Sequence, residues 1–146
     1  MKRAWIIVLL ISLSSPYAGA RLGENKEQVE DRYGKPTEAL ESPSKAIKDS
    51  NRYTTDVYSV RVDFLDGESG FEVYRKLDES KISSAEIKRL LDANADDSKW
   101  VKKGEETVHR DWWYRKDGEA VASYDHHQNT LTVKTRDYQR AIESEK

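Results

Sequence analysis

The chain of 146 residues has no cysteine, three prolines, two phenylalanines and one methionine. Without cysteine it has no disulfide framework, no thiolate ligand and no cysteine nucleophile, so its stability has to come from packing alone. A lipoprotein anchor is excluded for the same reason, because the lipid is carried by a cysteine. An excess of one charge sign is also missing, since 25 basic and 27 acidic residues give a net charge of −2. This balance gives no electrostatic reason to expect nucleic acid or an anionic membrane as a partner.

Long hydrophobic runs are absent as well. The apolar stretch from Ala4 to Leu13 is about ten residues long, whereas a helix needs ~20 to cross a bilayer. It follows Lys2 and Arg3 and precedes the small residues at positions 18–20, which is the order of a secretory signal peptide. We therefore predict that residues 1–20 are cleaved and that 21–146 form a single domain. This domain would act in the periplasm or outside the cell, without a stable membrane anchor.

Helix-capping signals occur at three places in the predicted mature chain. Asn25 and Gln28 have the spacing of a capping box, and Ser83 and Glu86 repeat it ahead of an apolar helical face. Thr135 can cap a third helix near the C-terminus. These signals predict three short helices.

Strand signals fall into two groups separated by the second helix. Residues 57–65 alternate apolar and polar side chains, and 71–77 follow after a five-residue loop with two glycines, which predicts a hairpin. A meander of three strands is predicted over 108–115, 120–124 and 130–135, with a type I′ turn at Asp117 and Gly118. Residues 35–50 show no sustained periodicity and predict an irregular connection. The expected fold is α+β, an antiparallel sheet made of the hairpin and the meander, with helices packed on one face.

The segment from Gly23 to Pro36 has a recognisable order of residues: a glycine, a polar cap, a short helix with a valine, and then Tyr-Gly-Lys-Pro. This order resembles the opening helix of the SmpA/OmlA (BamE-like) family over about fourteen residues. The resemblance implies a role in envelope assembly and a protein partner. Taken whole, the chain also resembles uncharacterised small exported bacterial proteins with an "RLGE" mature start and an "RYGKP" turn, which implies a fold but no activity.

Three consecutive aromatic residues are the main candidate for a binding surface. In a strand, Trp112 and Tyr114 share one face and Trp113 takes the other. If one face is core, at least one large aromatic side chain lies on the opposite surface, where it could bind a sugar or a partner protein. The alternative is that the aromatics pack on both sides or are shielded by the long stems of Arg115 and Lys116.

Two adjacent histidines, His126 and His127, follow Asp125 in a predicted loop and are weak candidates for metal ligands. Adjacent residues in an extended chain point to opposite faces, so we expect a solvated polar turn and no metal site.

Catalytic motifs are lacking too, since the sequence has no G-x-S-x-G, H-E-x-x-H, P-loop or dinucleotide-binding pattern. We therefore expect a protein without enzymatic activity or cofactor that binds another envelope or secreted protein. The alternative is a module that binds a carbohydrate or envelope ligand through exposed aromatic side chains.

Overall fold

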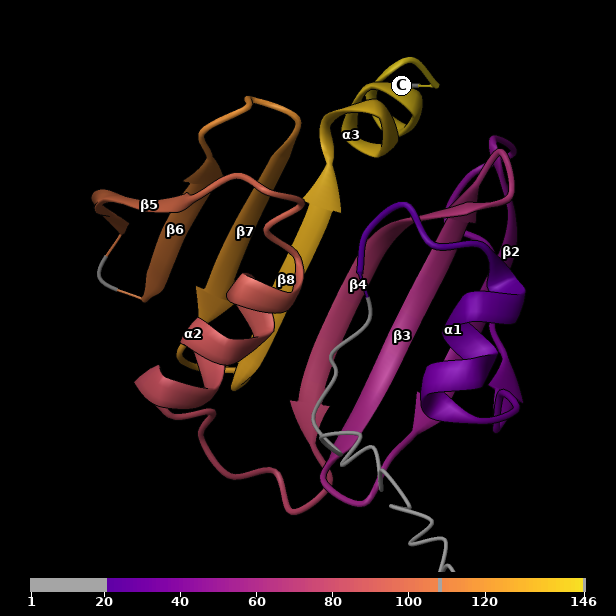
Figure 1. Ribbon diagram of the computed structural model, residues 1–146, viewed down its shortest axis with the longest axis horizontal. Coiled ribbons are helices and arrows are strands. Elements are labelled where there is room, and N and C mark those ends of the chain that lie inside the picture. Colours follow the sequence, from indigo (N-terminus) through magenta and orange to yellow (C-terminus); the bar gives the residue numbers. More distant parts are fainter. Residues whose placement is uncertain (1–20, 108, 146) are drawn as a thin grey trace, which may run out of the picture.

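The computed structural model describes residues 21–107 and 109–145. The predicted signal peptide, residues 1–20, lies outside these ranges. In chain order the described elements are α1 (Lys26–Tyr33), β1 (Glu38–Ala39), β2 (Ile47–Thr54), β3 (Tyr58–Leu65), β4 (Glu68–Lys76), α2 (Ser84–Ala93), β5 (Trp100–Thr107), β6 (Arg110–Arg115), β7 (Ala120–Asp125), β8 (Thr130–Thr135) and α3 (Arg136–Glu143). The strands form one antiparallel sheet in the order β1-β2-β3-β4-β8-β7-β6-β5 (Figure 1). The predicted α+β class is therefore confirmed.

The sheet consists of two similar halves. Each half is a short helix followed by four antiparallel strands, and the halves join where β4 pairs with β8 in antiparallel orientation. Both α1 and α2 begin with a capping box, as the sequence predicts. The arrangement leaves β1 and β5 as the two edges of the sheet, so β5, with eight residues, is the long edge strand.

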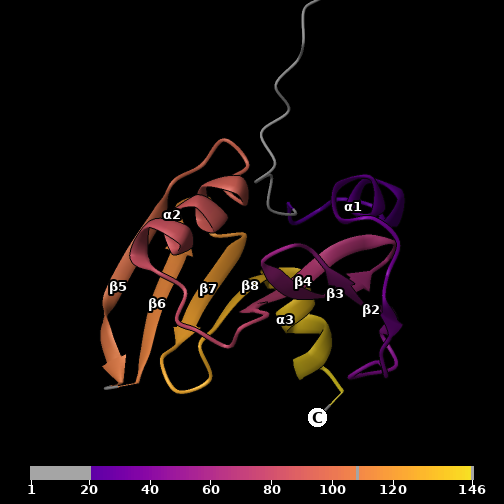
Figure 2. The same ribbon diagram turned by 90° about the horizontal axis from the view of Figure 1, so that it is seen from below.

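The main core lies between the sheet and the two helices α1 and α2, which lie on the same side of it (Figure 2). Val29 of α1 is fully buried, and Leu90 and Leu91 of α2 are nearly so. The strands contribute alternate side chains to this core: Tyr53, Val60, Val62, Phe64, Tyr74, Ala122, Tyr124, Leu131 and Val133. In the described part of the chain, no helix has the length and apolar character that a membrane span requires.

The third helix packs on the opposite side of the sheet, which differs from the prediction that all helices share one face (Figure 2). Asp63 and Phe71 alternate with core residues and therefore point away from α1 and α2. Tyr138 of α3 stacks on Phe71 with ring centroids 4.9 Å apart, and its hydroxyl donates to Asp63 across 2.6 Å. The helix turns under the sheet because Thr135, the last residue of β8, is already its N-cap.

The strand β2 was not predicted, and it begins inside the segment expected to be irregular. Its sequence, IKDSNRYT, is mostly polar, yet it pairs with β3 along most of its length and buries Ile47 and Tyr53. Ser50 and Asn51 are also buried. Pairing with a neighbouring strand has outweighed the weak local pattern.

The turns differ from the sequence prediction in their detail. Asp66 and Gly67 both have positive φ, 52° and 84°, which is the requirement of a two-residue type I′ turn, so the predicted five-residue loop is much shorter. At the predicted type I′ position, Gly118 has φ 80° but Asp117 does not have a positive φ. The hairpin between β6 and β7 is present all the same.

Candidate functional site

The strand β6 carries all three predicted aromatic residues, and its register divides them between the two faces of the sheet. Trp113 lies on the side of α2 and packs against the core. Trp112 and Tyr114 lie on the other side, where they pair with Ser123 and Val121 of β7. Tyr114 is 41% exposed, and Leu77 is the other large hydrophobic side chain that stays exposed among the described residues. On the side opposite the main core, Tyr114 is therefore exposed, whereas Trp112 is half-buried and its indole nitrogen is buried.

The surface around these two residues is not covered by any described helix, because α3 packs over β4 and β8 (Figure 2). On the edge strand β5, Lys103 pairs with Trp112 and Val101 pairs with Tyr114. Arg110 lies with its guanidinium carbon 5.7 Å from the centre of a Trp112 ring. We call this surface the open face, and its central side chains are Val101, Lys103, Arg110, Trp112, Tyr114 and Val121.

The side of the sheet that carries the open face is basic, although the whole chain has a net charge of −2. Among the strand residues whose side chains are described, the register places six basic and four acidic side chains on this side. The basic ones are Arg52, Arg61, Arg75, Lys103, Arg110 and Lys134, and the acidic ones are Glu38, Asp63, Glu68 and Asp125. A surface of this sign attracts an acidic ligand or partner and repels a basic one.

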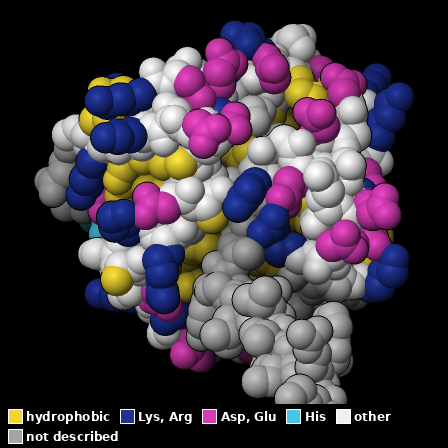
Figure 3. Space-filling view, viewed as in Figure 1, with side chains coloured by type: hydrophobic (Ala, Val, Ile, Leu, Met, Phe, Trp, Pro, Cys, Tyr) yellow, Lys and Arg dark blue, Asp and Glu magenta, His cyan; other side chains and the backbone are white. Residues whose placement is uncertain are grey.

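A groove of about 610 Å³ lies on the other side of the sheet, between α2 and the strands β5 and β6. Trp100 and Trp113 line it together with Ile87 and Leu91 of α2. Its charged lining residues are Lys88, Asp92, Lys99, Lys102 and Asp111. Figure 3 shows hydrophobic side chains at the surface in this region, edged by lysine and arginine. The groove therefore combines an aromatic floor with hydrogen-bonding groups around it.

The two predicted histidines are placed apart and have other partners. The Nε2 atom of His126 lies 3.1 Å from Asp111, and the ring of His127 lies against the ring of His109 with centroids 4.2 Å apart. Asp125 accepts two backbone hydrogen bonds within its own turn. A hydrogen bond from Arg110 and these backbone donors lower the pKa of Asp125 to about 2. No group of three metal-ligating side chains occurs among residues 21–107 and 109–145.

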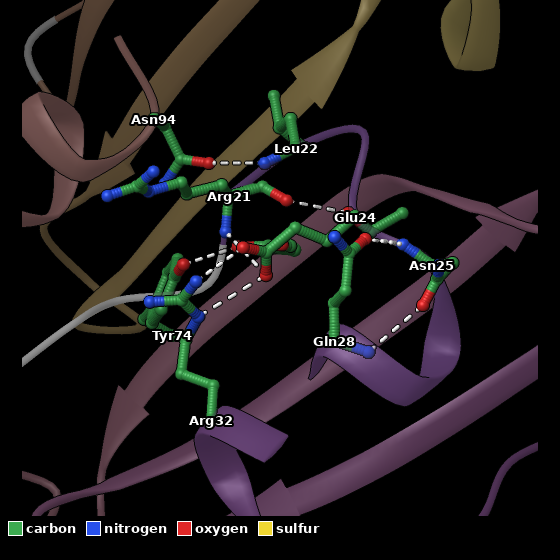
Figure 4. A network of polar contacts seen from close by, with 10 residues as sticks. Arg21, Leu22, Glu24, Asn25, Gln28, Arg32, Tyr74 and Asn94 are labelled. Carbon is green, nitrogen blue, oxygen red and sulfur yellow. Dashed lines mark hydrogen bonds and ion pairs between the residues drawn. The ribbon is translucent and has the colours of Figure 1, made fainter. Parts of the chain in front are cut away.

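A buried polar cluster lies beneath the start of the described chain, and the sequence did not predict it (Figure 4). Arg32 of α1 forms an ion pair with Glu24, and both side chains are largely buried. Glu72 on β4 is fully buried and accepts a hydrogen bond from the Tyr74 hydroxyl. Burial is the main cause that raises the pKa of Glu72 to about 7, and the charge of Glu24 adds to it. We call Glu24, Arg32 and Glu72 the carboxylate cluster.

This cluster was missed because the alternating pattern of β4 left its inward face ambiguous. Glu72, Tyr74 and Lys76 form one face, and Phe71, Val73 and Arg75 form the other. Hydrophobicity favours the second set, but the structure buries the first under α1 and α2. Phe71 of the second set packs against Tyr138 of α3. The sequence of β4 does not reveal that α3 lies on this side of the sheet.

Comparison of the chain with known protein families, curated proteins and solved structures found no match in any of the three. The resemblance of the opening helix to the SmpA/OmlA family therefore stays a prediction.

Proposed function

We propose that this protein is an exported binding module without enzymatic activity, and that it contacts another envelope or secreted protein through the open face. The observation that carries this proposal is that Trp112 and Tyr114 lie on one side of β6, next to but outside the part of the sheet that α3 covers. Tryptophan and tyrosine are the residues most enriched at the energetic centres of protein interfaces.

Burial of these aromatic side chains would contribute substantially to the free energy of binding. A large aromatic side chain that loses roughly 100 Å² of exposed surface on binding contributes about 2.5 kcal/mol at ~25 cal/mol per Å². Both aromatic side chains project from β6, which is paired with a strand on each side, so little conformational freedom is lost when a partner covers them. The lysines and arginines around them add a charge preference, which favours a partner with an acidic surface.

The proposal is tested by capturing partners from a native envelope extract with the mature protein. We expect that a partner retained by the wild type is lost with the double variant Trp112→Ala, Tyr114→Ala. Binding to that partner, once purified, should weaken as the salt concentration rises, because the open face is basic. The change in affinity is measured by titration calorimetry.

Leu77→Ala is the matched control, since Leu77 is 48% exposed but lies outside the open face. This variant removes an exposed apolar side chain and should leave binding unchanged. Equal binding by the wild type and by a folded double variant would refute the role of the open face.

A second candidate is a carbohydrate ligand in the groove, and it is favoured by the two tryptophans that line it. Sugar rings stack on indole, and the charged side chains around the floor offer both donors and acceptors. The double variant and the variant Trp113→Phe together separate the two candidates, because Trp112 and Trp113 lie on opposite faces of the sheet. A glycan that binds the double variant as well as the wild type, but not Trp113→Phe, would place its site in the groove.

A further inference from the structure

The first described residues form a strap that lies over the sheet between α1 and α2 (Figures 1 and 4). The Leu22 amide donates to the side chain of Asn94 at the end of α2, across 2.9 Å. Gly23 and Glu24 exchange backbone hydrogen bonds of 2.8 and 2.7 Å with Ser69 of β4. The strap is therefore fixed on both sides, and the backbone nitrogen of Arg21 has a defined position.

That nitrogen points at the carboxylate cluster. It lies 3.4 Å from Oε2 of Glu24, which is also bound by Arg32. Figure 4 shows the side chain of Arg21 extending away from these carboxylates, so its guanidinium does not neutralise them. The cluster thus holds two carboxyl groups, Glu24 and Glu72, and one guanidinium group.

A largely buried site with an excess carboxylate is unfavourable unless a cation is added or a proton is taken up. The Arg21 nitrogen contacts Glu24, and the titratable groups joined to Glu24 by an ion pair or by its charge are Arg32 of α1 and Glu72 of β4, with Tyr74 bound to Glu72. Since Arg32 is the cation among them, the charge is unbalanced whenever both carboxyl groups are ionised.

We propose that cleavage between residues 20 and 21 supplies the missing cation, so that the new α-ammonium group of Arg21 binds Glu24 and balances the carboxylate cluster. This inference rests on the predicted signal peptide and is independent of what the open face binds. Hydrolysis adds water across the peptide bond, the new carboxylate leaves with residues 1–20, and the freed amine takes up a proton. Processing then does more than remove a segment, because it completes an ionic site in the fold.

The test compares two chains that differ at the amino terminus, one beginning at Arg21 and one beginning at Gly19. In the first, we expect the pKa of the α-amine to lie about one unit above its ordinary ~7.7–8.0. The stabilisation is present below the ordinary amine pKa and is lost as the pH rises through the raised one. The Arg21 chain should therefore have the higher melting temperature at pH 7, and the two chains should melt alike above pH 10.

Glu24→Gln, introduced into both chains, should remove the difference between them at pH 7. Glu27→Gln is the matched control, because Glu27 is an exposed carboxyl in the first turn of α1. The α-amine pKa, measured by NMR in the unmutated chains, decides the matter even if Glu24→Gln prevents folding. An ordinary amine pKa in the Arg21 chain, or equal melting of the two chains at pH 7, would overturn the proposal.

The processing step has its own readout, which is the mass of the protein recovered after export. A product that begins at Arg21 supports the proposal. A product that begins elsewhere overturns the assignment of the cleavage site, whatever the two purified chains show about the ammonium group.

Discussion

Replacing Glu72 by glutamine should stabilise the protein at neutral and alkaline pH. Glu72 is fully buried, and this burial raises its pKa from the ordinary value of 4.5 to about 7. In the folded state the carboxyl group therefore keeps its proton at a pH where the unfolded chain has already lost it. Folding binds a proton in this window, so stability falls as the pH rises from about 4.5 to about 7.

The magnitude follows from the two pKa values. The two pKa values differ by about 2.5, which at ~1.4 kcal/mol per pKa unit amounts to at most about 3.5 kcal/mol above pH 7. Glutamine is neutral at every pH, and it can still accept the hydrogen bond of Tyr74. Glu72→Gln should thus approach the wild type in stability near pH 4.5 and exceed it by up to about 3.5 kcal/mol at pH 8. For a domain of this size that corresponds to roughly 10 °C in melting temperature.

The assay is urea unfolding followed by circular dichroism at several pH values between 4.5 and 8.5. It is best made with the chain that begins at Gly19, so that no ammonium group lies at Arg21. Glu68→Gln is the control, because Glu68 is an exposed carboxyl on the same strand. If Glu72→Gln were as stable as the wild type at pH 8, or less stable, Glu72 would be ionised in the fold and stabilised by Arg32.

Two further predictions concern the packing of α3 under the sheet. Tyr138→Phe removes the hydroxyl that donates to the buried carboxylate of Asp63, and we expect a loss of about 1.5–3 kcal/mol in urea unfolding at pH 7; an unchanged unfolding midpoint would show that Arg61 satisfies Asp63 alone. Gly70→Ala places a Cβ atom 3.1 Å from Cβ of Tyr138, so about 1–3 kcal/mol should be lost. Hydrogen exchange should then speed up in α3 and not in α2, and equal protection of both helices would contradict the proposed clash.

The elements that the sequence predicted correctly are those whose signals are local. The capping boxes at Asn25 and Ser83 identified α1 and α2, since a cap needs residues only three positions apart. The last three strands were found because apolar alternation and turn residues coincide there. The strand β2 was missed because its edges are satisfied by β1 and β3, which the local sequence does not reveal.

Of the candidate site, the sequence predicted only what depends on local alternation within a strand. Alternation in a strand guarantees that Trp112 and Trp113 point to opposite sides, but it does not say which side the helices cover. That choice depends on the long-range pairing of β4 with β8, which joins the two halves of the sheet. Glu72 shows the limit most clearly, because a carboxyl group on the buried side of a strand contradicts the hydrophobic pattern on which the prediction relies.

The joining of two similar halves also explains why polar groups gather in the middle of the molecule. The helices α1 and α2 each lie over part of their own half of the sheet, so the junction of the halves lies between the two helices. The strap from Arg21 to Asn25 lies there, and its irregular backbone brings amides and carbonyls that require polar partners. Ser69 and Asn94 supply such partners, and the carboxylate cluster lies under the same strap. The amino-terminal segment is thus part of the fold itself, since its backbone is bonded to both β4 and the end of α2.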